Sequence, residues 1–227
     1  IREALKRAEI DPALVDEVIM GNILSAGLGQ APARQAALTG GVPPTVAALT
    51  INKMCGSGLK AVMLADQAIR LDDAKIVVAG GMESMTRAPY LIPGMRSGLK
   101  FGNGQLIDSM LYDGLWCTFH DCGMGEHAET TAEQNDISRA DQDEFAALSQ
   151  RRAAQAAAAN EFADEIVPVP IRVKREEVMM TADEGPRPDT TAEVLAKLRP
   201  AFRSDGTVTA GNSSMLSDGA AAVVVAN

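Results

Sequence analysis

The sequence predicts an α/β fold in which a layered sheet domain is interrupted by a long insertion. In residues 1–81, short apolar runs alternate with segments of helical periodicity, which is typical of βαβ units and a parallel sheet. Residues 82–135 are instead rich in Met, Gly and polar residues, with only short periodic pieces. The last eight residues return to the composition of a buried strand. We therefore expect the insertion to run from about residue 85 to 216.

The sheet domain is expected to open with an amphipathic helix over residues 1–9, which ends before Asp11-Pro12. The apolar run Val18–Met20 predicts a strand. A second helix is expected over Pro32–Leu38. Proline is tolerated near the first position of a helix, because the N–H group that it lacks would have no partner within the helix. Gly40 and the glycine after it end this helix.

Three further elements complete this part of the domain. Residues Thr45–Ile51 are β-branched and apolar, which favours a buried strand. The segment Gly56–Leu71 predicts a helix with its large apolar residues on one side. Lys75–Ala79 predicts another short buried strand, which we expect Gly80-Gly81 to stop.

The insertion contains three predicted elements. A long helix is expected over Ser138–Asn160, with Ser138 as its cap and Asp141 at the third helical position, as in a capping box. Glu165–Val173 predicts a strand at a sheet edge, since it contains two prolines. Thr190–Leu198 predicts a short capped helix, and residues 211–219 form a polar connection.

Composition limits the possible partners. A hydrophobic fraction of 46% and a charged fraction of 22% are ordinary for a globular protein. The net charge of −9 argues against nucleic acid as a partner, because tracking phosphates requires a basic face. No apolar run approaches the roughly 18 residues of a membrane span, so no membrane partner is expected. Eight acidic residues fall within 121–145, which we interpret as a solvated helix face or an acidic surface between subunits.

The ends of the chain predict a fragment. The sequence opens within a helical pattern without an initiator Met and closes on an apolar strand, so we expect segments to be missing at both ends. Any targeting peptide would therefore be unobservable. The three cysteines, Cys55, Cys117 and Cys122, do not suggest a disulfide framework and fit a reducing compartment, which predicts a cytoplasmic protein.

The segment with the clearest chemistry is Asn52–Lys60, where a buried strand runs into a tight turn and a helix begins at once. Cys55 lies at this turn, where the helix N-terminus favours the nucleophilic thiolate. Gly56 and Gly58 permit the sharp turn and allow a substrate to approach the backbone. This arrangement is typical of a nucleophile elbow that carries sulfur instead of oxygen.

Two alternatives apply to the same segment. Cys55 could be a small buried core residue, because cysteine is among the most buried residue types. The Gly-x-Gly sequence could instead indicate phosphate binding, but the lysine of a P-loop and the third glycine of a dinucleotide site are both missing.

Five blocks of the sequence, in order, resemble the thiolase family of acetyl-CoA acetyltransferases and 3-ketoacyl-CoA thiolases. The nucleophile block is Asn52–Gly58, and the others are Gly27–Ala36, Ala79–Met85, the pair Lys197–Phe202 and Gly206–Ser214, and Ser217–Ala221. The resemblance implies a five-layer αβαβα fold, of which this chain would hold one incomplete half. Residues 1–84 and 217–227 would form that core, and residues 85–216 would form a loop domain that covers CoA.

The resemblance also implies a mechanism. Cys55 would attack an acyl thioester, form an acyl-enzyme and pass the acyl group to a second thioester or to CoA. The backbone N–H of Cys55 would contribute to an oxyanion hole. The family's activating His, its Asn and its second Cys belong to a C-terminal half that is missing here, as is the first strand. His120 and His127 do not match the catalytic His.

Six residues of this sequence match motif positions that contact the coenzyme in the thiolase family. Leu115, Met124 and Leu198 would line the pantetheine path, and Ala210 and Ser214 would contact the pantetheine. Arg187 would lie near the adenine or phosphate end of the coenzyme. The alternatives are core packing for the three apolar residues and a solvated surface charge for Arg187. Many biosynthetic members have His before the Met-Gly of this loop, where this sequence has Cys122-Gly123, so the acyl-chain preference stays open.

A zinc site is a further possibility within the insertion. Cys117, His120, Cys122 and His127 are all ligand types, but their spacing fits no common structural site, and we expect no metal. The sequence thus predicts a thiolase, most simply an acetyl-CoA C-acetyltransferase. Its expected substrates are acyl-CoA thioesters, with no permanently bound cofactor, in a homodimer or homotetramer. The alternatives are a longer-chain 3-ketoacyl-CoA thiolase, a non-catalytic protein that binds CoA thioesters, and a condensing enzyme that uses acyl-carrier protein, which the blocks around Cys55 and Asn212 disfavour.

Overall fold

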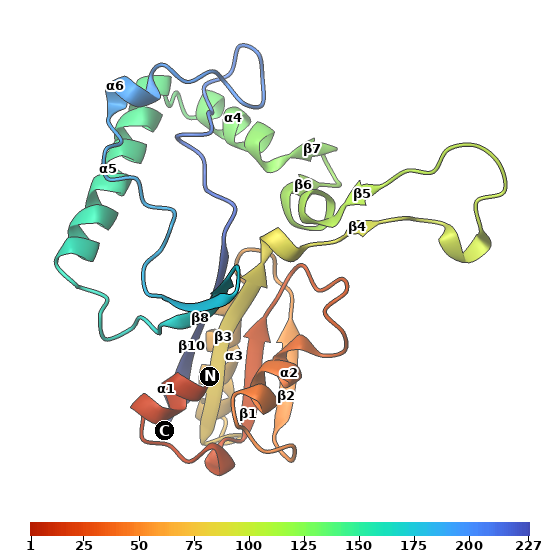
Figure 1. Cartoon of the computed structure of the whole chain (residues 1–227), viewed down its shortest axis with the longest axis vertical. Helices are drawn as coiled ribbons and strands as arrows, with labels where there is room; N and C mark the ends of the chain where they lie inside the picture. Colours follow the sequence, from red (N-terminus) through yellow and green to blue (C-terminus); the bar gives the residue numbers. More distant parts are fainter. The chain divides into compact units, whose positions relative to one another are not determined.

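The structure is a computed structural model that describes residues 1–227 and contains two compact units (Figure 1). The first unit comprises Ile1–Trp116 and Leu216–Asn227, and the second comprises Cys117–Met215. The boundary expected from the sequence lay at residue 85. Residues 85–116 fall within the first compact unit, where a Cβ at Gly114 would lie 3.4 Å from Leu24.

A four-stranded sheet organises the first unit, with the strand order β10–β3–β1–β2. The strands are β1 (Glu17–Gly21), β2 (Ala47–Ile51), β3 (Ile76–Ser84) and β10 (Asp218–Ala226). β1 pairs in parallel with both β2 and β3, as the alternating pattern predicts. β10 pairs antiparallel to β3, so the sheet is mixed rather than wholly parallel.

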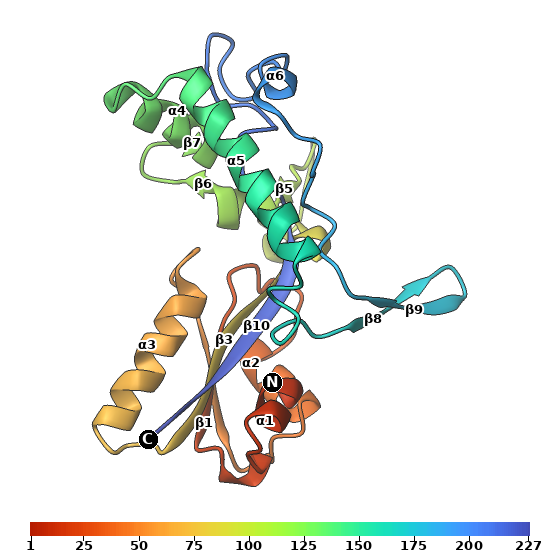
Figure 2. The same ribbon diagram turned by 90° about the vertical axis from the view of Figure 1, so that its left-hand side faces the viewer.

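Helices cover both faces of this sheet, as Figure 2 shows. Helices α1 (Arg2–Arg7) and α2 (Pro32–Thr39) lie on one side and α3 (Ser57–Arg70) lies on the other. Alternate residues of β1 serve the two cores, since Val18 packs toward α1 and α2 while Ile19 packs toward α3. An α–β–α sandwich results, which explains why these strands are apolar at consecutive positions.

The strand β3 is longer than the sequence predicts, because Gly80 and Gly81 do not end it. A Cβ atom at Gly80 would lie 2.0 Å from the carbonyl oxygen of Ala221 in β10. Glycine at this position is therefore required by the close pairing of the two strands. At the far end of the pair, Asp218 accepts hydrogen bonds from Ser84 and from both the backbone and the hydroxyl of Thr86.

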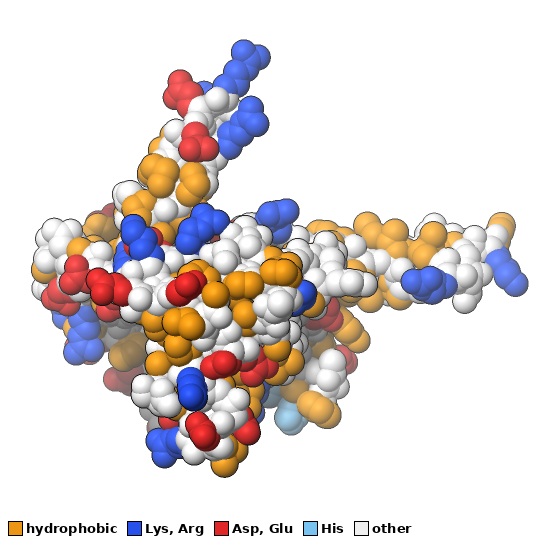
Figure 3. All heavy atoms as spheres, turned by 90° about the horizontal axis from the view of Figure 1, so that it is seen from below, with side chains coloured by type: hydrophobic (Ala, Val, Ile, Leu, Met, Phe, Trp, Pro, Cys, Tyr) orange, Lys and Arg blue, Asp and Glu red, His pale blue; other side chains and the backbone are white.

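The first unit contains further short elements, most of which follow β3 in the sequence. They are three 3₁₀ turns (Pro12–Leu14 near the N-terminus, Met85–Arg87 and Met95–Ser97), the antiparallel pair β4 (Tyr90–Leu91) and β5 (Ile107–Asp108), and a π-helical turn over Met110–Leu115. Residues 92–106, between β4 and β5, form the arm at the right of Figure 3, where apolar and basic side chains are interspersed.

The second unit contains more regular structure than the sequence predicts. Its elements are the strand pair β6 (Trp116–Cys117) and β7 (Cys122–Gly123), helices α4 (Met124–Gln134), α5 (Arg139–Ala158) and α6 (Ala192–Leu195), and the antiparallel pair β8 (Val169–Val173) and β9 (Glu176–Met180). The cap of α5 matches its prediction, since Ser138 and Asp141 form the reciprocal capping box. Helix α4 and strand β9 were not predicted. None of the helices has the length and apolar character needed to cross a membrane.

We predict that Gly80→Ala destabilises the intact protein by at least about 2 kcal/mol, because the added methyl group would overlap the backbone of β10. Gly81→Ala is the matched control, since its Cβ would have no neighbour nearer than 3.4 Å. Urea unfolding of both variants measures the difference. Equal stability of the two variants would contradict the role assigned to the β3–β10 contact.

Candidate functional site

Cys55 lies in the turn between β2 and α3, at the end of the sheet where the parallel strands β1 and β3 reach their carboxyl ends. Its thiol is free and exposed, so the alternative of a buried core cysteine is wrong. In open parallel sheets this edge is the usual location of ligand sites. The position thus agrees with a reactive role for the thiol.

The turn that carries Cys55 is held in a strained conformation. Met54 has a φ of +49°, in the left-handed region that non-glycine residues rarely adopt. Ser57 fixes the turn from the inside, because its hydroxyl donates to the carbonyl of Met54 at 2.6 Å and accepts from the N–H of Lys53 at 2.8 Å. Strain of this kind, about 1–3 kcal/mol, persists only where surrounding contacts impose it.

Glycines allow the start of α3 to approach the sheet closely. A Cβ atom at Gly21 would lie 2.6 Å from Cβ of Ser57, so no side chain fits at the end of β1. On the helix side, Gly58 faces the backbone of Gly80 and Gly81. Residues at this junction set the height of Cys55 above the strands.

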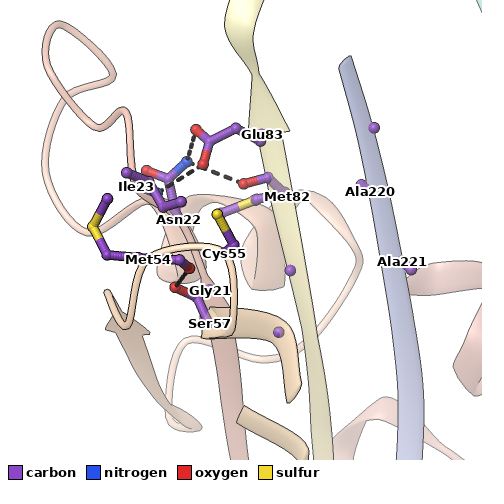
Figure 4. A pocket seen from close by; sticks show the side chains of 13 residues that line it. Gly21, Asn22, Ile23, Met54, Cys55, Ser57, Met82, Glu83, Ala220 and Ala221 are labelled. Atoms are coloured by element: carbon purple, nitrogen blue, oxygen red, sulfur yellow. Dashed lines mark hydrogen bonds between the residues drawn. The ribbon is translucent and has the colours of Figure 1, made fainter. Parts of the chain in front are cut away.

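A hollow of about 470 Å³ opens beside Cys55, lined by the ends of β1 and β3, the start of β10 and the Cys55 turn (Figure 4). Its lining is mostly glycine and apolar side chains, and the polar side chains besides Cys55 are Asn22, Ser57 and Glu83. This volume is within the range of small-molecule sites.

Glu83 and Asn22 form a polar network at the rim of this hollow that sequence reasoning missed. Glu83 accepts hydrogen bonds from the Asn22 amide at 2.9 Å and from the backbone N–H groups of Ile23 and Leu24 at 2.8 and 3.1 Å. The Asn22 amide nitrogen also donates to the Met82 carbonyl, whereas its buried Oδ1 has no partner. The network joins the ends of β1 and β3. The only sequence signal for it was that Glu83 lies within the motif block Ala79–Met85.

Two buried carboxylates organise the second unit. They are exceptions within residues 121–145, where most acidic residues are exposed, as a solvated face requires: Asp121, Glu133, Asp136, Asp141 and Glu144. Glu129 is only 2% exposed and accepts hydrogen bonds from the N–H groups of Thr207 and Val208 and from the Thr207 hydroxyl. Burial opposes the charged form, but these donors and the nearby Arg203 together lower the pKa of Glu129 below its ordinary value of 4.5.

Asp143 is the second buried carboxylate, also 2% exposed. It pairs with Arg139 at 2.7 Å and accepts a hydrogen bond from the Asn212 amide at 2.9 Å. Asn212 in turn accepts from the N–H of Thr209 at 2.7 Å. The turn over residues 209–213 is thereby fixed on α5.

The structure brings together some of the predicted coenzyme contacts. Leu198 packs on this turn, since a Cβ at Gly211 would lie 2.5 Å from its Cδ1 atom, and Ala210 and Ser214 lie exposed within and just after the turn. Met124 begins α4 and is partly exposed.

Two of the predicted coenzyme residues lie elsewhere. Arg187 is exposed, and its backbone N–H donates to Gln150 of α5 at 2.7 Å. Leu115 is half-buried at the end of the π-helical turn and belongs to the first unit.

The two thiols of the insertion differ from one another. Hydrogen bonds from the His127 side chain and from His120 lower the pKa of Cys117 to about 6. Burial and the negative charge of Glu126 raise the pKa of Cys122. Cys117 therefore ionises near neutral pH, whereas Cys122 remains a thiol.

Comparisons with known proteins identify the family to which this chain is similar. The family model described as "Thiolase, N-terminal domain" matches residues 1–227. An acetyl-CoA acetyltransferase of Pseudomonas aeruginosa is 53% identical over 226 residues, which cover 99% of this chain and 58% of that protein. An acetyl-CoA acetyltransferase of Escherichia coli K12 is 52% identical over 226 residues, covering 99% and 57%.

A solved structure gives the same result. The crystal structure of the Bacillus anthracis acetyl-CoA acetyltransferase superposes with a TM-score of 0.94 at 43% sequence identity, covering 99% of this chain and 57% of that one. The chain thus spans a little over half the length of the relatives it matches.

We predict that Glu129→Gln destabilises the protein by about 2–4 kcal/mol at pH 7, because an amide can replace only part of the hydrogen bonding of a buried carboxylate. Since the folded pKa lies below 4.5, the stabilisation by the carboxylate is complete above that pH and is lost as the pH falls through the folded pKa. Urea unfolding at pH 7 and at about pH 4 measures both effects.

The matched control for this prediction is Glu133→Gln, on the same helix. Glu133 is 67% exposed and pairs with Arg203 at 2.9 Å, so its loss should cost less than about 1 kcal/mol. A loss of similar size in both variants would contradict the organising role of Glu129.

Proposed function

Because the chain belongs to the thiolase family, through the family's N-terminal domain, we propose that the intact protein is an acyl-CoA C-acyltransferase of the acetyl-CoA acetyltransferase type. The observation that carries the proposal is the exposed Cys55 thiol, which sits in a strained turn before α3 beside a hollow of about 470 Å³. The relatives named acetyl-CoA acetyltransferase, at about half identity, support the substrate class.

In the proposed first step, the Cys55 thiolate attacks the carbonyl carbon of an acyl-CoA. The carbonyl oxygen takes up the negative charge, and the backbone N–H of Cys55 contributes to its stabilisation. Collapse of the tetrahedral intermediate breaks the bond to the CoA sulfur, and CoA leaves with a proton. The products are an acyl-cysteine and free CoA.

In the second step, the α-carbon of a second acetyl-CoA loses a proton and attacks the acyl-cysteine. A carbon–carbon bond forms, the Cys55 sulfur leaves as thiolate, and acetoacetyl-CoA is released. Thiolysis is the reverse, in which CoA attacks the acyl-cysteine. The groups that move these protons belong, by resemblance, to the family's second half, which the 227 residues do not include.

For the second unit we propose coenzyme binding through the turn at 209–213 and its surroundings. Leu198, Ala210, Ser214 and Met124 would contact the pantetheine, and Leu115, by its motif position, would line the pantetheine path. Arg187, exposed and cationic, would contact the nucleotide phosphates. No permanently bound cofactor is part of this proposal, since CoA thioesters are substrates.

We further propose a cytoplasmic homodimer or homotetramer that acts in fatty acid metabolism. The three free cysteines are those of a reducing compartment. Exposed apolar side chains on the arm between β4 and β5, among them Met95, Phe101 and Leu106, support association between copies.

We predict that incubation of the intact protein with acetyl-CoA adds one acetyl group, located on Cys55 by peptide mass spectrometry. Cys55→Ala should abolish both this label and acyl transfer, whereas Cys122→Ala should retain the label. Acetylation of Cys117 or Cys122 in place of Cys55 would refute the assignment. A folded protein that binds CoA without any acetylation would support the alternative of a non-catalytic CoA-binding protein.

We predict that Arg187→Ala raises the KM for acetyl-CoA about tenfold and leaves kcat unchanged, because a lost charge-assisted hydrogen bond costs roughly 1.4 kcal/mol of binding. Arg175→Ala, an exposed arginine in the turn between β8 and β9, is the control. Steady-state kinetics measure both variants. If the KM of Arg187→Ala equals that of the control, the phosphate contact is wrong.

A further inference from the structure

Three side chains that the proposed acyl transfer does not use come together at the start of the second unit. Cys117 ends β6, His120 lies in the turn that follows, and His127 is the fourth residue of α4. Their ligand atoms, one sulfur and two imidazole nitrogens, all lie within 4.8 Å of one another. Cys122, the other candidate in this region, is not part of the group.

The three side chains face one another directly. Cys117 Sγ lies 3.3 Å from Nδ1 of His120, and a ring nitrogen of His127 lies within 4.8 Å of both of the other ligand atoms. The two imidazole rings meet edge to face, with centroids 5.1 Å apart and planes at 84°. Both rings therefore turn toward the same sulfur atom.

The backbone fixes the elements that carry these ligands. The N–H of Gly123 donates a hydrogen bond to the Glu126 carboxylate at 2.8 Å. This bond caps the start of α4, and Glu126 directly precedes His127. Arg203 donates to the Thr130 hydroxyl at 2.8 Å and so anchors the next turn of the helix. The ligands on β6 and on α4 are thus held near one another by contacts that do not involve the ligand atoms.

One thiolate and two imidazoles form a ligand set that suits Zn²⁺, which takes Cys and His in a tetrahedral arrangement. With Zn–S near 2.3 Å and Zn–N near 2.0–2.1 Å, the ligand atoms of a tetrahedral site lie roughly 3.3–3.6 Å apart. The Cys117–His120 separation of 3.3 Å already meets this geometry. The widest separation, 4.8 Å, requires a contraction of about 1 Å, which rotation of the exposed His120 side chain can supply.

We propose that Cys117, His120 and His127 bind one Zn²⁺ ion, with solvent in the fourth position. The sequence alone set zinc aside because the spacing of four ligand residues fits no common site. The structure resolves this difficulty, since only three of the four converge, from a turn and a helix. The bound ion would tie the β6–β7 turn to the first turn of α4.

The test is zinc binding by the untagged, metal-free intact protein, measured by competition with a chromophoric chelator and without acyl-CoA. One equivalent per chain is expected. The variants expected to bind zinc more weakly are Cys117→Ser, His120→Ala and His127→Ala. Each should lower the zinc affinity more than tenfold, because even the loss of a residue that only hydrogen-bonds to a ligand costs at least about tenfold in affinity. Cys122→Ser and Cys55→Ser are the matched controls and should bind as the unaltered protein does.

Cobalt provides an independent readout. Co²⁺ in the site should show a thiolate-to-metal charge-transfer absorption that Cys117→Ser removes and Cys122→Ser retains. Circular dichroism checks that each variant is folded, and His120→Ala, in an exposed turn, keeps the test decisive if His127→Ala unfolds. The proposal is overturned if the intact protein binds no zinc in the micromolar range, or if the three ligand variants bind it as tightly as the controls.

Discussion

The close approach of α3 to the carboxyl ends of β1 and β3 is the constraint on which the site around Cys55 depends. It requires glycine at Gly21, where a Cβ would lie 2.6 Å from Ser57. With the helix start so near the sheet, the chain before it must turn sharply, and Met54 takes a left-handed φ of +49°. Cys55 is the next residue of this turn, and it is exposed beside the hollow. Backbone geometry thus places the proposed nucleophile.

In the second unit, buried charged side chains fix the conformation of an irregular segment. Glu129 on α4 and Asp143 on α5 each receive hydrogen bonds from the segment 203–212, which has little regular structure of its own. Isolated buried carboxylates would be costly, but here each has several donors, so the segment is fixed in one conformation. The turn that is proposed to contact CoA is therefore supported by buried carboxylates, while the turn at Cys55 is supported by glycine contacts and the hydrogen bonds of Ser57.

Local sequence patterns predict much of this structure. They fail where contacts with segments far along the chain determine the length of a strand or the burial of a side chain. The helices over residues 2–7 and 57–70 and the cap at Ser138 follow from periodicity and capping chemistry, and the family blocks identify Cys55. The length of β3 could not be predicted, because Gly80 ends a strand by local rules yet here accommodates β10, which lies far along the chain. For the same reason Glu129 looks solvated in the sequence, although its donors come from residues about 80 positions away.

The most direct test of the account is the single-turnover rate of acetyl transfer from acetyl-CoA to Cys55 in the Gly21→Ala variant of the intact protein. A methyl group at Gly21 would displace the start of α3, whereas Gly58→Ala, with no neighbour nearer than 3.8 Å, serves as the control. The account predicts a loss of at least about tenfold in the Gly21 variant alone, since small misplacements of a nucleophile are costly. An unchanged rate in a folded Gly21→Ala protein would contradict it.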